Sequence, residues 1–149
     1  MKLLDFIVCD DIRQERGDKL SFMGVFGDTI KLQIPKGASR PVPFRVAAFF
    51  RILVEDQDVV PDRFKIVIKM GTEVAASFEG GIGAKGKPRL MGFPLPQLPV
   101  PAFDDGILSF QALFFAGDKL LLDATPAYGT SVQLVEVESV PVISHGAPT

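Results

Sequence analysis

Apolar and polar side chains alternate with a period of two over much of the chain. Within residues 63–70, Phe64, Ile66 and Ile68 share one face, whereas Lys65 lies on the other. Successive side chains of a β-strand point to opposite faces, so this pattern predicts a half-buried strand. No long window keeps the apolar stripe of an amphipathic helix, and we therefore expect little helix.

Short turns that contain glycine separate the predicted strands. Three of them stand between β-rich runs: Gly17-Asp18, Gly71-Thr72 and Gly117-Asp118. Glycine at the first central position of a two-residue loop satisfies the positive φ of a type II′ turn. The sequence therefore predicts three hairpins and an antiparallel arrangement.

About eight strands at this spacing are typical of a sandwich or a barrel. We predict an all-β fold, an antiparallel β-sandwich that is immunoglobulin-like in broad architecture. The chain of 149 residues has the length of one domain. Residues 1–143 are assigned to that domain, and the small, polar residues 144–149 to a flexible tail.

Residues 80–101 interrupt the alternation with glycine and then with regularly spaced proline. Alternate prolines exclude a central strand, so we interpret this segment as an extended crossover along an edge of the sandwich. Residues 96–99 also fit the P-x-x-P form of a peptide ligand, which is the alternative interpretation. Residues 81–86 spell G-x-G-x-x-G, but a phosphate cradle needs a helix after the glycines and a proline-rich segment follows instead.

Composition narrows the classes of function. The net charge of −2 provides no field for nucleic acid, and we expect no nucleic-acid partner. The chain has 13 Phe, 1 Tyr and no Trp, which favours a dry core over a sugar-stacking surface. One cysteine and no apolar run of membrane-spanning length indicate a cytoplasmic protein without a membrane span.

Residues 8–28 contain C-D-D-x-R-x-E, a glycine turn, K-x-S and then G-V-F. This segment resembles the opening of a family of small uncharacterised bacterial proteins. The resemblance implies a bacterial origin, and it supplies no activity, cofactor or catalytic residue.

No constellation of acid, base and nucleophile is visible, so we expect no catalytic residues and no cofactor. His145 is the one histidine and lies in the predicted tail. Cys9 lies in a predicted strand, where a buried, inert thiol is the expected state. A charged cluster in the first hairpin faces Lys19 and consists of Asp10, Asp11, Arg13 and Glu15. Its candidate ligand-binding residues are Asp10, Asp11 and Arg13.

Acidic residues in the connections supply a candidate metal site. If they converge at one end of the sandwich, their carboxylates offer oxygen ligands for Ca²⁺. The candidate ligands are Asp56, Asp58, Asp104 and Asp105. Asp is also a common turn former, and that explanation competes with a metal site.

We therefore predict a non-enzymatic binding or assembly module with a protein partner or a second copy as its ligand. The alternatives are a domain that binds a metal ion or a small ligand, or an enzyme that uses carboxylates of the acidic loops.

Overall fold

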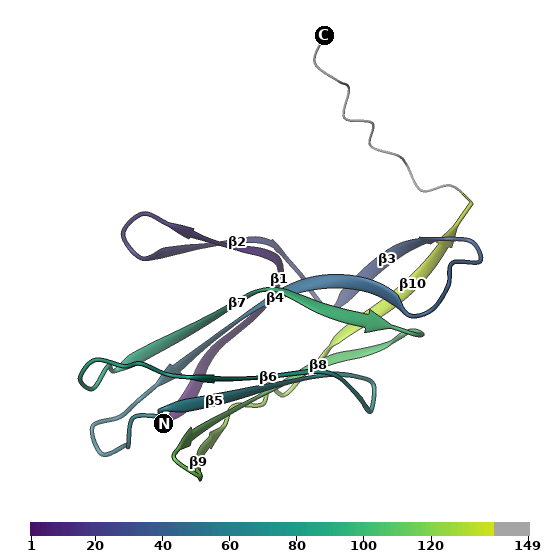
Figure 1. Cartoon of the computed structure of the whole chain (residues 1–149). Coiled ribbons are helices and arrows are strands. Elements are labelled where there is room, and N and C mark those ends of the chain that lie inside the picture. Colours follow the sequence, from purple (N-terminus) through teal and green to yellow (C-terminus); the bar gives the residue numbers. More distant parts are fainter. Residues whose placement is uncertain (139–149) are drawn as a thin grey trace.

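Ten β-strands build the fold of residues 1–138, which the computed structural model describes (Figure 1). In chain order they are β1 (Lys2–Glu15), β2 (Lys19–Val25), β3 (Thr29–Pro35), β4 (Val42–Leu53), β5 (Arg63–Met70), β6 (Glu73–Gly81), β7 (Leu90–Ala102), β8 (Gly106–Ala116), β9 (Lys119–Asp123) and β10 (Thr130–Val137). No helix occurs among these residues. The predicted tail, with His145, lies outside the described residues.

The strands form two sheets that pack face to face. Sheet A has the order β2-β1-β4-β7, and sheet B has the order β3-β10-β8-β5-β6, with β9 on the remaining part of β8. The predicted all-β sandwich is confirmed, with ten strands in place of about eight. One pair departs from the expected antiparallel arrangement, because β3 and β10 run parallel.

Phenylalanine fills the space between the sheets. The ring of Phe50 lies 4.8 Å from that of Phe6 and 6.4 Å from that of Phe110, centroid to centroid. A second group joins Phe93 to Phe114 at 5.0 Å. These tilted and edge-on contacts are the preferred geometries of aromatic rings, and the absence of polar ring atoms suits them to a dry core.

The interpretation of residues 80–101 as a crossover is wrong over most of its length. Residues 90–102 form β7, which pairs with β4 along its whole length. Four of these residues are proline, and proline is tolerated there because β7 is an edge strand. Leu98 is buried in the main core, so the P-x-x-P segment is part of a strand and does not form a free peptide ligand.

The three predicted hairpins are present, and they differ in turn geometry. Gly71 and Gly117 have φ of 61° and 55°, as a two-residue turn with glycine first requires. In the first hairpin both Gly17 and Asp18 have positive φ, and three residues separate β1 from β2. The predicted type II′ turn is therefore wrong at that position.

A second, smaller hydrophobic cluster lies on the outer face of sheet A. Alternate residues of β4 point either to the main core or to this outer cluster, which includes Ala47 and Phe49. Phe22 of β2 packs on Phe49, with ring centroids 5.2 Å apart, although β2 is not hydrogen-bonded to β4. The hairpin of β1 and β2 thus folds back over the outer face of sheet A. In Figure 1 it lies outside the space between the two sheets.

No helix among the described residues has both the length and the apolar character that a membrane crossing needs.

Candidate functional site

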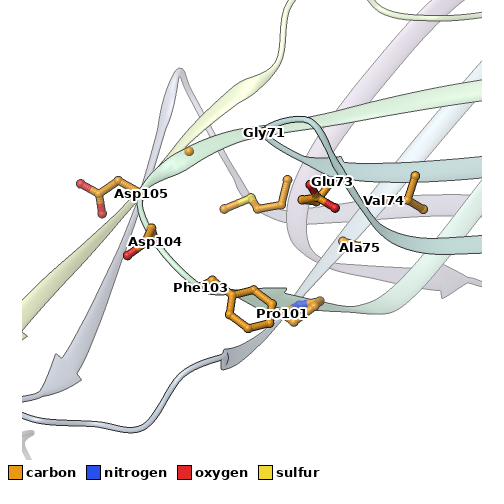
Figure 2. A pocket seen from close by; sticks show the side chains of 10 residues that line it. Gly71, Glu73, Val74, Ala75, Pro101, Phe103, Asp104 and Asp105 are labelled. Atoms are coloured by element: carbon orange, nitrogen blue, oxygen red, sulfur yellow. The ribbon is translucent and has the colours of Figure 1, made fainter.

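A pocket of about 250 Å³ opens where the β5–β6 turn faces the β7–β8 turn. Its lining combines the first residues of β6 with the last residues of β7 and the turn that follows. Figure 2 shows Pro101 and Phe103 on one side of the cavity and Val74 and Ala75 on the other. Because β6 and β7 are the edge strands of different sheets, the pocket lies in the open side of the sandwich.

The walls of the pocket are apolar and open to solvent. Val74 and Phe103 are each 59% exposed, and Met70, which also lines the pocket, is half-buried. Large apolar side chains are common on protein surfaces one at a time, but here two of them face the same cavity. This arrangement offers apolar area that a ligand would remove from water.

The rim of the pocket is acidic. Glu73, Asp104 and Asp105 line the pocket, and none of its ten lining residues is basic. The Asp105 carboxylate has a structural task, because its Oδ1 accepts a hydrogen bond of 2.8 Å from the backbone N–H of Leu134. Glu73 and Asp104 add the negative potential that favours a cationic ligand.

The turn that carries one wall is fixed to the sheet. The N–H of Gly71 donates to the carbonyl of Ile107 at 2.8 Å, which ties the β5–β6 turn to β8. Gly71 has a φ of 61°, a conformation that glycine adopts without the strain of a Cβ atom. The pocket is therefore built on a positioned turn.

The first hairpin carries the candidate ligand-binding residues Asp10, Asp11 and Arg13. Asp11 pairs with Arg13 at 3.3 Å, and its other oxygen accepts from the N–H of Ile12 at 2.9 Å. The register places Lys19 opposite Glu15 and Met23 opposite Asp11, so within the charged cluster only Glu15 lies directly across from Lys19. The contacts of Asp11 thus hold the local shape of the hairpin.

The four candidate metal ligands are not brought together. The β4–β7 register places Leu53 beside Leu90 and Val42 beside Ala102. Asp56 and Asp58 follow the first of these ends, whereas Asp104 and Asp105 follow the opposite one, a strand length away. The condition for a shared site is not met because β4 and β7 are antiparallel, and residues 1–138 contain no group of three or more potential metal ligands.

Asp58 has a local partner. Its carboxylate forms an ion pair with the amino group of Met1 and accepts a hydrogen bond of 2.8 Å from the N–H of Glu55. The hydrogen bond from that amino group is the main cause that lowers the pKa of Asp58. Asp58 therefore closes the β4–β5 connection onto the start of β1.

Cys9 is a fully buried thiol of the outer cluster, as predicted. Its Sγ donates to the carbonyl of Asp11 at 3.4 Å. Burial is the main cause that raises the pKa of the Cys9 thiol, so the reactive thiolate is disfavoured.

The sequence identified Asp104 and Asp105 of the pocket rim as candidate site residues, but it did not identify the apolar residues of the pocket. Phe103 lies between a proline-rich run and two aspartates, just after the segment interpreted as a crossover. A large apolar residue at a turn is a signal in itself, because such positions usually carry polar residues. What the sequence does not reveal is that the fold brings Phe103 to Val74.

The chain matches no protein-family model, and no curated protein is significantly similar to it. The function is therefore argued from the geometry of the site.

Proposed function

We propose that the protein is a non-enzymatic binding module that holds an exposed segment of a protein partner in the pocket between β6 and β7. The observation that carries the proposal is the pair Val74 and Phe103, which face one cavity while each remains 59% exposed. Complete burial of one such side chain contributes about 1.5–3 kcal/mol. Because Val74 and Phe103 are each 59% exposed, a little over half of that free energy is available to a ligand at each residue. An apolar side chain of a partner would bury both.

The charge of the rim specifies the partner further. The pocket contains Glu73 and Asp104 without a basic residue, so the partner carries lysine or arginine next to its apolar anchor. The same acidic rim disfavours a symmetric dimer through the pocket, because two acidic rims would meet. We expect binding to weaken as salt concentration rises, since rim charges are screened.

The test uses a fluorescein-labelled heptapeptide that alternates lysine with leucine, and a matched peptide that alternates glutamate with leucine. Fluorescence anisotropy should detect saturable binding of the basic peptide, with the acidic peptide at least about tenfold weaker. Absence of binding by the basic peptide, or equal binding of both peptides, contradicts the proposal.

Two valine variants locate the site. Val74→Ser changes the pocket, and Val59→Ser is its control, because Val59 has the same exposed fraction of 59% and is not a lining residue of the pocket. We expect Val74→Ser to weaken peptide binding several-fold and Val59→Ser to leave it unchanged. Equal loss in both variants places the peptide elsewhere and overturns the assignment of the site.

A further inference from the structure

The free edge of β7 lacks hydrogen-bond donors over much of its length. In an antiparallel pair, alternate residues direct both backbone groups to the partner strand or both away from it. The N–H of Val54 donates to the carbonyl of Arg89 at 2.9 Å, which sets this alternation at one end of the β4–β7 ladder. Pro94 pairs with Phe49, five residues along the register from the bonded pair of Val54 and Arg89. An odd number of steps places Pro94 among the outward residues, so its nitrogen faces the free edge.

A bulge keeps the later prolines in the same phase. The register shifts between Val46 and Ala48 of β4, where β7 has one extra residue, and Gln97 there has a φ of 54°. If the same residues alternated without this register shift, Pro99 and Pro101 would turn their nitrogens toward β4 and interrupt the ladder. With it, the outward positions on both sides of the bulge are prolines that present carbonyls and no N–H.

The free edge of β6, the other edge strand of the open side, keeps its donors. The N–H of Ile82 donates to the carbonyl of Asp62 at 2.7 Å, which sets the alternation of the β5–β6 ladder. By that count Ser77 and Glu79 direct N–H and C=O away from β5. The nine residues of β6 include no proline.

Charge along β6 differs between its two ends. Glu79 pairs with Lys65 at 3.2 Å and with Arg63 at 3.8 Å, so its charge is locally compensated. Glu73, at the start of the strand, lies in the pocket with Asp104. Among residues 1–138, the negative charge that has no ion pair is therefore at the pocket end of the edge.

From these observations we propose that the partner segment is extended and adds to the free edge of β6 as a further strand, with its apolar anchor in the pocket. This inference rests on the proposed function and adds the mode of recognition. Backbone groups of Ser77 and Glu79 supply the ladder, and the cationic residue of the segment lies near Glu73. The donor-poor edge of β7 cannot offer the same ladder, which leaves β6 as the receiving edge of the open side.

The decisive variant is Ser77→Pro, with Ser77→Ala as its control. The nitrogen of residue 77 faces away from β5, so proline there removes a free-edge donor and leaves the β5 ladder intact, as the prolines of β7 do. We expect Ser77→Pro to weaken binding of the labelled lysine–leucine heptapeptide by about tenfold or more and Ser77→Ala to bind like the original protein. Equal binding by both variants overturns strand addition.

Amide hydrogen exchange of the unaltered protein provides a second test, independent of whether Ser77→Pro folds. Addition of the heptapeptide should slow exchange at Ser77 and Glu79 by about tenfold or more, while Ala76 and Phe78, bonded to β5, are slow before addition. Unchanged exchange at Ser77 and Glu79 in the saturated complex contradicts the proposal.

The outcomes separate the two proposals. If Val74→Ser weakens binding and Ser77→Pro does not, the pocket binds the peptide but strand addition is wrong. If the original protein binds no basic peptide, both proposals fail. If light scattering shows a dimer that Ser77→Pro converts to monomer, a second copy occupies the edge, and the proposal of a separate partner is overturned.

Discussion

The carboxylate of Asp10 occupies the space in which a side chain on Gly24 would stand. Gly24 also has a φ of 61°, which L-residues with a Cβ atom rarely adopt. The close approach of Asp10 and the positive φ both require glycine at this position. It occurs where the hairpin of β1 and β2 leaves the sheet.

Gly24→Ala should destabilise the protein by about 2 kcal/mol or more, because strain at positive φ alone costs roughly 1–2 kcal/mol and the contact with Asp10 adds to it. Gly27→Ala is the control, since no atom lies within 4 Å of the added methyl group and φ there is not positive. Denaturant unfolding measures the difference. In an Asp10→Ala background, Gly24→Ala should lower the free energy of unfolding by less than it does in the original protein. An equal loss in both backgrounds would show that the contact with Asp10 contributes nothing.

Asp105→Ala should lower the free energy of unfolding by about 1–2 kcal/mol. The pairing of β10 with β8 ends at Val132 and Gly106. Leu134 is the next residue of β10 whose N–H points to the β8 side, and this N–H donates to the Asp105 carboxylate. Asp105→Asn retains an acceptor and should cost less. Thermal unfolding of both variants, with Asp104→Ala as the control on the same turn, checks this. A loss in Asp104→Ala equal to that in Asp105→Ala would contradict the assigned role.

Cys9 should resist a thiol reagent in the folded protein at pH 8 and react at once in denaturant, because the thiol is buried and its pKa is raised. The raised pKa also predicts a pH dependence. The protonated Cys9 thiol contributes fully to the free energy of unfolding below the usual thiol pKa of 9.0. This contribution is lost as the pH rises from 9.0 through the higher pKa of Cys9 in the folded protein. Unfolding curves of the original protein and Cys9→Ala should therefore converge in that range; parallel pH profiles would refute the linkage.

Replacement of Pro94, Pro96 and Pro99 by threonine should restore N–H groups to the free edge of β7 and increase self-association. Size-exclusion chromatography with light scattering, across a range of protein concentrations, compares the variant with the original protein. The triple variant should form a larger species at lower concentration. Identical profiles would mean that proline does not protect this edge.

The sequence predicted those features that local chemistry determines. Alternation identified β5, and the glycine turns identified the three hairpins, because strand faces and tight turns depend on neighbouring residues. β3 was missed, although Ile30, Leu32 and Ile34 alternate with polar residues, and its parallel pairing with β10 joins segments about a hundred residues apart. No local signal specifies such a pair.

Residues 80–101 were predicted to be a crossover because of their prolines, yet residues 90–102 form an edge strand. Proline is excluded from a central strand and not from an edge, and edge position is a property of the whole sheet. The same limit explains the site. The candidate metal ligands lie at opposite ends of the paired strands β4 and β7. Val74 and Phe103 instead line one pocket only through the packing of the two sheets.

The hairpin that folds over sheet A gives the molecule two hydrophobic clusters of unequal size. The smaller one contains Cys9, Ile12 and Phe49, and the larger one continues between the sheets without them. Loss of the smaller cluster leaves the ladder between β4 and β7 in place, so the hairpin is a unit that can open by itself. The protein should therefore show partial melting, in which Cys9 becomes labelled well before the sandwich unfolds.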